Sequence, residues 1–193
     1  MDGTKKMVGN ASRTRSIAFV GLAIALMTVS AWVSIPLGPV PFTLQTFVMV
    51  FALLVLGPRE CVAAITGYLV LGAIGLPVFS SMRGGIGMLV GPTGGFLWGF
   101  LLGAAIALVF LQGARSRMAK RGASKRHEFA ADLIAGLIFL AIAYLCGWVQ
   151  LMAVAALDPA AAFVTAIAPF ILIDVVKLVA GVCTARAVRL AVR

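Results

Sequence analysis

Long stretches without a charged side chain constrain this chain more than any other feature. Residues 16–58, 61–82, 84–114 and 133–157 contain no Asp, Glu, Lys or Arg. A helix that crosses the hydrocarbon core of a bilayer needs about 20 mostly apolar residues. Hydrophobic residues make up 62% of the 193 residues and charged residues only 11%, which is more apolar surface than a soluble domain needs. The sequence therefore predicts one membrane domain that crosses the bilayer several times.

Prolines and glycines divide these stretches into helices, because proline lacks an N–H donor and disfavours helix in the residue before it. The first predicted helix ends before Pro36, the second before Gly57 and the third before Gly75. The predicted fold is an all-α bundle of six transmembrane helices over residues 16–185, with an N-terminal segment 1–15 and a C-terminal tail 186–193. The predicted helices span residues 16–35, 42–56, 61–74, 93–112, 129–156 and 159–185.

Basic residues are concentrated on one side of this predicted topology. With six helices, 14 of the 16 Lys and Arg residues fall at the two chain ends or in the connections after the second and fourth helices. Because cytoplasmic connections are enriched in Lys and Arg, both termini are predicted to be cytoplasmic. This orientation explains the net charge of +10, so nucleic acid is not an expected partner. The basic cluster 115–126 either only orients the chain or also contacts anionic lipid of the bilayer.

Asp174 and Lys177 are charged residues within the last apolar segment. Three residues apart, they project from one face of a helix. An ionised side chain at the centre of a membrane helix costs about 2.5–3.5 kcal/mol, so it usually lines a solute or ion path. We therefore predict a binding site for a hydrophilic small molecule. The alternatives are a pair that only neutralises itself and a lysine whose charged end reaches the membrane surface.

Three further polar residues are candidates for the same site. Gln45 carries a donor and an acceptor within an apolar helix, and the alternative is a hydrogen bond to a neighbouring backbone. Tyr68 combines a ring with a hydroxyl, and the alternative is a place in the core. Arg83 is the only charge in the glycine-rich connection 75–92, which either folds over the site as a lid or forms an ordinary turn. Three aromatic residues are interpreted as packing side chains: Phe42, Phe47 and Trp98.

The sequence offers little for catalysis or for metal binding. His127 is the only histidine and lies in a basic connection, so neither a metal site built from several histidines nor a histidine-based catalytic pair is expected. No lysine ends a Gly-x-x-x-x-Gly-Lys-Ser/Thr phosphate loop, so energy must come from a partner or an ion gradient. No catalytic residue and no cofactor is predicted, and an intramembrane enzyme is the alternative of another class. The scattered cysteines are interpreted as small apolar side chains without disulfides: Cys61, Cys146 and Cys183.

Small residues recur four apart on two of the predicted helices. Gly21 and Ala25 form a flat face on the first helix, which suits close contact with another helix. That face either packs within this chain or contacts another membrane protein. Gly99 and Gly103 on the fourth helix are predicted to serve internal packing.

Four ordered motifs resemble the pattern of the BioY family. Residues 38–47 have the sequence Gly-Pro-Val-Pro-Phe-Thr-Leu-Gln-Thr-Phe, and residues 75–79 have the sequence Gly-Leu-Pro-Val-Phe. Residues 91–95 have the sequence Gly-Pro-Thr-Gly-Gly, and two residues separate Asp174 from Lys177. The resemblance extends from the first predicted helix to the sixth. Phe96 departs from the family pattern, which has tyrosine after the two glycines, so no hydrogen bond from a hydroxyl is expected there.

This resemblance implies the biotin-specific substrate-capture component of an energy-coupling-factor transporter, located in the inner membrane of a bacterial cell. It implies an external cavity capped by the first and third interhelical connections, with cytoplasmic ATPase subunits and a transmembrane coupling subunit as partners. Biotin's ureido group offers N–H donors and a carbonyl acceptor. Asp174 can accept from an N–H, and Lys177 can donate to the ureido or the valerate oxygens. The alternative is a capture component or secondary transporter for another small solute or vitamin.

Overall fold

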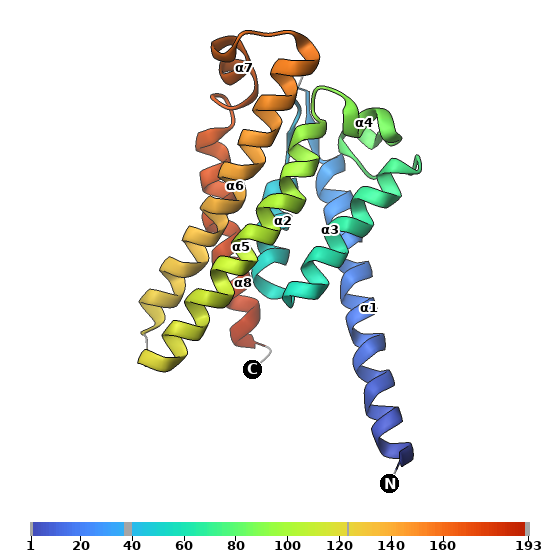
Figure 1. Cartoon of the computed structure of the whole chain (residues 1–193), viewed down its shortest axis with the longest axis vertical. Helices are drawn as coiled ribbons and strands as arrows, with labels where there is room; N and C mark the ends of the chain where they lie inside the picture. Colours follow the sequence, from blue (N-terminus) through green and yellow to red (C-terminus); the bar gives the residue numbers. More distant parts are fainter. Residues whose placement is uncertain (1, 37–39, 123, 192–193) are drawn as a thin grey trace.

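The chain folds into a bundle of helices that run along one long axis (Figure 1). The computed structural model describes residues 2–36, 40–122 and 124–191, without the side chains of residues 2–12 and 121. Gly38 and Pro39 of the first family-like motif therefore lie outside the described residues. The α-helices are α1 (Asp2–Trp32), α2 (Gln45–Val55), α3 (Pro58–Ala73), α4 (Ile86–Val90), α5 (Gly94–Arg121), α6 (Lys125–Ala155), α7 (Pro159–Ala166) and α8 (Ile171–Ala191).

The long helices continue beyond their apolar parts. α1 begins at Asp2 rather than at residue 16, α5 continues to Arg121 rather than ending at 112, and α6 begins at Lys125 rather than at 129. Lys, Arg and Glu are good helix formers, so a charge marks the end of an apolar span without ending the helix. Gly122 caps the C-terminal end of α5, and its φ of 62° is the left-handed conformation that glycine adopts readily.

The prediction of one continuous helix over residues 159–185 is wrong. Residues 159–185 form two helices, α7 and α8, which are bent by 47° relative to each other. The break contains Pro169, which has no N–H to donate and whose ring clashes with the preceding turn. As a result Asp174 lies in the first turn of α8, where the helix dipole favours a negative charge.

The structure supports a mostly helical, multi-pass membrane protein. Three helical stretches are long and apolar enough to cross a membrane, namely Arg13–Trp32, Gly94–Lys120 and Lys125–Ala155. The bent α7–α8 pair makes a fourth if it is counted as one span, and α2 is a shorter apolar helix. α3 has 16 residues, or about 24 Å of helix. Helices are present at all six predicted places, and the number of spans stays a prediction.

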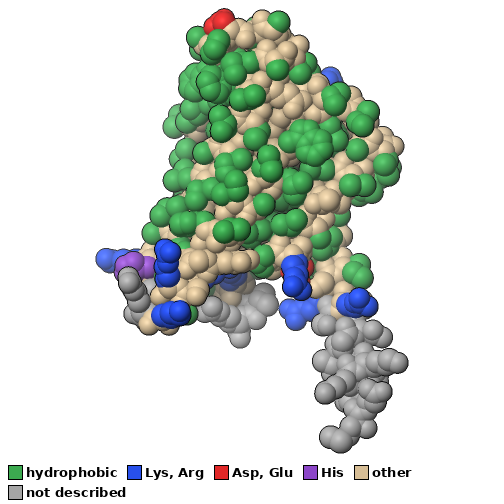
Figure 2. Space-filling model, viewed as in Figure 1, with side chains coloured by type: hydrophobic (Ala, Val, Ile, Leu, Met, Phe, Trp, Pro, Cys, Tyr) green, Lys and Arg blue, Asp and Glu red, His purple; other side chains and the backbone are tan. Residues whose placement is uncertain are grey.

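Apolar and basic side chains separate along the long axis. Figure 2 shows hydrophobic side chains over the body of the molecule and Lys and Arg gathered mainly at one end. That end is where α1 begins and where α8 ends (Figure 1). We call it the basic end. This distribution agrees with the charge segregation predicted from the sequence.

Glycines allow α5 to lie directly against α6. A Cβ atom at Gly99 would lie 2.7 Å from Cα of Ala143, and one at Gly103 would lie 2.8 Å from the carbonyl oxygen of Phe139. Both distances are shorter than a carbon atom tolerates, so only glycine permits this approach. The prediction that these two glycines serve internal packing is confirmed.

Short elements close the end of the bundle opposite the basic end. Two short strands, β1 (Ser34–Ile35) and β2 (Phe42–Thr43), pair antiparallel between α1 and α2. The connection between α3 and α5 contains a 3-10 turn, η1 (Ser80–Met82), and the short helix α4. The indole N–H of Trp32 donates to the carbonyl of Pro77 at 2.7 Å and so ties this connection to α1.

Candidate functional site

A cavity lies beneath these connections, between α2, α5, α6 and α8. The space between its walls is about 710 Å³, counting the part that is open to solvent. The β1–β2 hairpin and the α3–α5 connection both contribute lining residues, as the family resemblance implied. Most of the wall is apolar and includes Phe42, Phe79, Phe96, Leu97, Phe100 and Phe170.

Asp174 provides the negative charge of the cavity and is 5% exposed. Its Oδ1 accepts from the hydroxyl of Thr46 at 2.9 Å and from Nζ of Lys177 at 2.7 Å. Its Oδ2 accepts from the hydroxyl of Tyr144 at 2.5 Å. A carboxylate has about four lone-pair positions, so three donors leave room for one more. Donors from α2, α6 and α8 thus hold the carboxylate in one orientation.

Lys177 provides the positive charge and is 8% exposed. Besides its bond to Asp174, Nζ donates to the carbonyl of Thr43 at 2.6 Å. Nζ also lies 3.9 Å from the ring centroid of Phe42, close enough for a cation–π interaction. An ammonium group has three N–H donors, so one donor remains for a solute in the cavity. The structure therefore brings the two predicted charges together in a mostly apolar pocket.

Gln45 and Tyr68 form a hydrogen-bonded chain that leads away from the cavity. Gln45 lines the cavity, and its amide nitrogen donates to the hydroxyl of Tyr68 at 3.0 Å. That hydroxyl donates to the carbonyl of Val78 at 3.0 Å. Tyr68 is fully buried and is not among the described lining residues, so it supports Gln45 and the α3–α5 connection from behind.

Two other sequence interpretations have different outcomes. Arg83 is exposed and is not among the described lining residues. Its carbonyl accepts from the backbone N–H of Phe79, so its described contribution to the site is through the backbone. Phe42 was interpreted as a packing residue; it does pack against a hydrophobic cluster, but its ring also lines the cavity beside Lys177.

Tyr144 and Thr46 were not predicted from the sequence. Tyr144 is one of two tyrosines and lies in the charge-free stretch 133–157. A hydroxyl in such a stretch needs a partner, which was the available signal. Thr46 follows Gln45 directly within the first family-like motif, so it also carried a signal. The ring of Tyr144 packs edge to face on Phe96, with ring centroids 6.3 Å apart.

The small-residue face of α1 does not pack within the chain. Gly21 and Ala25 are exposed, and no described atom lies within 4 Å of the position that a Cβ at Gly21 would take. Internal packing is thus the wrong alternative for this face. In the described part of the chain, no three His, Cys, Asp or Glu side chains gather in a way that could hold a metal ion.

The fold and the cavity define a multi-pass helical membrane protein with a small-molecule site. The family model of the BioY family matches residues 4–193, and the chain belongs to this family. It is 41% identical to "Biotin transporter BioY" of Thermotoga maritima, covering 86% of this chain and 90% of that protein. It is 35% identical to "Probable biotin transporter BioY" of Pyrococcus horikoshii, covering 90% and 95%.

A solved structure has the same fold. It is the S-component for biotin from an ECF-type ABC transporter, with a TM-score of 0.81 and 23% identity over 93% of each chain. This agreement extends over nearly the whole bundle.

Proposed function

We propose that this protein binds biotin in the cavity and carries it across the membrane as the substrate-specific component of an energy-coupling-factor transporter. The observation that carries the proposal is the single ion pair of Asp174 and Lys177 in an otherwise mostly apolar pocket of a BioY-family chain. Biotin has the matching chemistry, because its fused rings are compact and mostly apolar while its ureido and carboxylate groups are polar. Such a role is not enzymatic.

The remaining hydrogen-bonding capacity of the pocket fits this solute. Asp174 can accept one N–H of the ureido group, and Lys177 can donate to the ureido carbonyl or to the valerate carboxylate. The described hydrogen bonds of the Gln45 side chain use its amide nitrogen, so its amide oxygen can accept the second ureido N–H.

Titration of the detergent-purified protein with biotin tests the proposal. We expect saturable binding of biotin, and much weaker binding of thiamine, riboflavin and other vitamins in the same panel. Tighter binding of another solute would replace biotin with that solute. No binding of any member would contradict the assignment of this cavity as a vitamin site.

Two single variants and their combination separate solute contact from structural pairing. Asp174→Asn and Lys177→Met each leave a buried charge without its partner, which destabilises a protein by about 3–5 kcal/mol in soluble examples. The double variant removes both charges and should regain thermal stability. If both residues contact biotin, its affinity stays at least about tenfold below the wild-type value, since a hydrogen bond to a charged group contributes about 1.5–3 kcal/mol.

Matched controls for these variants lie outside the cavity. Asp158 caps α7 by accepting from two backbone N–H groups, and Asn caps a helix equally well, so Asp158→Asn should bind biotin normally. Lys120→Met removes one exposed charge at the basic end. Recovery of full biotin affinity in the double variant would show that the pair is only structural.

We further propose that Gly21 and Ala25 contact a transmembrane coupling subunit, which joins the protein to cytoplasmic ATPase subunits. The exposure of both residues supports this proposal, since small side chains let the backbone of another helix approach. The proposal includes cytoplasmic termini, supported by the gathering of Lys and Arg at the basic end (Figure 2). Arg83 remains a proposed solute contact, one that requires its exposed side chain to turn toward the cavity.

A further inference from the structure

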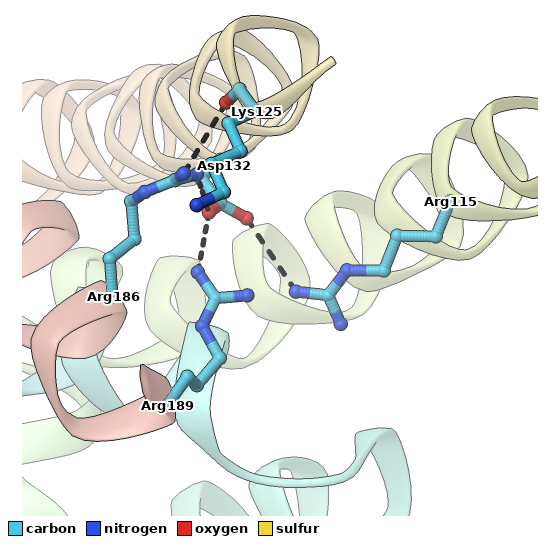
Figure 3. A network of polar contacts seen from close by, with 5 residues as sticks. All are labelled: Arg115, Lys125, Asp132, Arg186 and Arg189. Carbon is cyan, nitrogen blue, oxygen red and sulfur yellow. Dashed lines mark hydrogen bonds and ion pairs between the residues drawn. The ribbon is translucent and has the colours of Figure 1, made fainter. Parts of the chain in front are cut away.

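A second polar cluster lies at the basic end, where α5, α6 and α8 meet (Figure 3). Its centre is Asp132 on α6, which is 2% exposed. Three guanidinium groups contact its carboxylate: Arg189 at 2.5 Å, Arg186 at 3.4 Å and Arg115 at 3.5 Å. At about 1.5 Å per residue, Asp132 lies about 18 Å from Tyr144 along α6, so this cluster is separate from the solute cavity.

Among the described residues, the charges of this cluster are not balanced. One carboxylate neutralises one of the three arginines, and the exposed side chain of Glu128 offsets a second. Arg186 also donates to the carbonyl of Lys125 at 3.3 Å. In the described contacts, Arg115 and Arg189 each use one terminal nitrogen on Asp132, and a guanidinium has several further N–H donors. The cluster thus has positive charge and donors left for another anion.

A cavity beside the cluster gives an anion access to these donors. It encloses about 960 Å³, counting the space open to solvent, and Arg115, Arg189, Asp132 and Glu128 line it together with Met118 and Ala119. The side chain of Arg115 is 46% exposed, and only one of its terminal nitrogens contacts Asp132, so its other N–H donors are accessible to an anion while that contact is kept. Arginine forks bind phosphate oxygens in pairs, which makes phosphate the anion that this arrangement suits best.

We propose that this cavity binds the phosphate group of an anionic phospholipid. The cluster lies at the basic end, where the apolar surface of the bundle gives way to Lys and Arg (Figure 2), which is the level of lipid headgroups. Basic pockets between membrane helices are suited to acidic headgroups. Asp132 keeps the arginines together before the lipid arrives by reducing their mutual repulsion. Free inorganic phosphate offers the same oxygens, so the test includes it.

Native mass spectrometry of the intact purified protein measures the site directly. The probes are dioleoylphosphatidylglycerol, which is anionic, dioleoylphosphatidylcholine, which has no net charge, and inorganic phosphate as a competitor. We expect one phosphatidylglycerol to bind first and about fivefold or more tighter than phosphatidylcholine, since one basic residue near the surface contributes about 1 kcal/mol. Displacement of the lipid by an equal concentration of inorganic phosphate would assign the site to the free anion and overturn the lipid assignment.

Variants that remove a positive or a negative charge from the cavity lining test whether these residues bind the lipid. Arg115→Gln and Arg189→Gln should each weaken phosphatidylglycerol binding about fivefold, and Glu128→Gln should strengthen it. Arg117→Gln removes the same charge from an exposed residue of α5 that is not among the described lining residues, and it should change the affinity less than twofold.

Thermal melting shows which variants remain folded. If Arg189→Gln unfolds, the variants at the exposed residues Arg115 and Glu128 still test whether phosphatidylglycerol binds in this cavity. Equal losses in Arg115→Gln and Arg117→Gln would mean a diffuse surface charge and overturn the site. An unchanged or weaker affinity in Glu128→Gln would overturn it as well.

Discussion

At the residue scale, the site depends on how Asp174 is held. Its carboxylate accepts from Thr46, Tyr144 and Lys177, which come from three different helices. A buried carboxylate without hydrogen-bond partners is costly, so these donors offset the cost of burying it inside the bundle. They also fix the side chain in one orientation, so little rotamer freedom is left to lose when a solute binds. The orientation of the Asp174 carboxylate is therefore fixed by its neighbours before any ligand binds.

Tyr144→Phe tests this positioning role. The change removes the hydroxyl that donates to Asp174 and keeps the ring that packs on Phe96. Hydrogen bonds between membrane helices contribute about 0.6 kcal/mol on average, and bonds to charged groups up to about 3 kcal/mol. We expect biotin affinity to fall about threefold or more in a calorimetric titration.

The control for this variant is Thr165→Val, which removes a hydroxyl that donates within α7, away from the described cavity lining. It should leave biotin affinity unchanged. Wild-type affinity in Tyr144→Phe would mean that Thr46 and Lys177 hold the carboxylate without help. The role assigned to Tyr144 would then be wrong.

At the element scale, the sequence predicts where helices lie better than how they face each other. Charge-free stretches and prolines were sufficient to find a helix at each of six places. Pro169 was a visible signal for the break between α7 and α8 and was missed because the apolar stretch continues through it. In a membrane helix both the lipid face and the buried face are apolar, so hydrophobic periodicity does not indicate which side chains point inward.

This limit explains the mixed outcome for the predicted site residues. Asp174, Lys177 and Gln45 are polar residues within apolar helices, and all three line the cavity. Arg83 lies in a connection, where neither helical periodicity nor the cost of burial constrains the side chain, and it is exposed. The bond from Tyr144 to Asp174 depends on the rotation of α6 relative to α8, which no local pattern predicts.

The small-residue face of α1 gives a prediction about assembly. Gly21→Trp or Ala25→Trp places a bulky side chain on an exposed surface, so the fold and biotin binding should be unchanged. If a coupling subunit packs on this face, the side chain prevents close approach of the two backbones. We expect the variants to lose co-purification with the coupling subunit and ATP-driven biotin uptake.

Gly113→Trp is the matched control for the α1 variants. Gly113 is an exposed glycine on α5, and no described atom lies within 4 Å of its Cβ position. This variant should retain both co-purification and uptake. Loss of biotin binding with intact partner association in Gly21→Trp would contradict the proposed partner face.

At the scale of the whole molecule, the two ends of the bundle have different chemistry. The solute cavity lies beneath the β1–β2 hairpin and the α3–α5 connection, while the arginines around Asp132 lie at the basic end. α6 and α8 contribute to both sites, because α6 runs the length of the bundle and α8 runs from the level of the cavity to the basic end (Figure 1). The cavity proposed for the solute and the cavity proposed for the lipid phosphate therefore lie toward opposite ends of the bundle, and α6 and α8 contribute to both.

The orientation of these ends in the membrane is the last prediction. Arg83 and Lys120 are both exposed, so a cysteine introduced at either position can react with a thiol reagent. After Cys61, Cys146 and Cys183 are replaced by alanine, a membrane-impermeant maleimide applied to intact cells should label Arg83→Cys but not Lys120→Cys. The physical reason is that basic connections are retained in the cytoplasm, whereas the connection with a single arginine is translocated. Labelling after permeabilisation is the control for reactivity, and both positions should then react. Labelling of position 120 alone in intact cells would reverse the proposed topology.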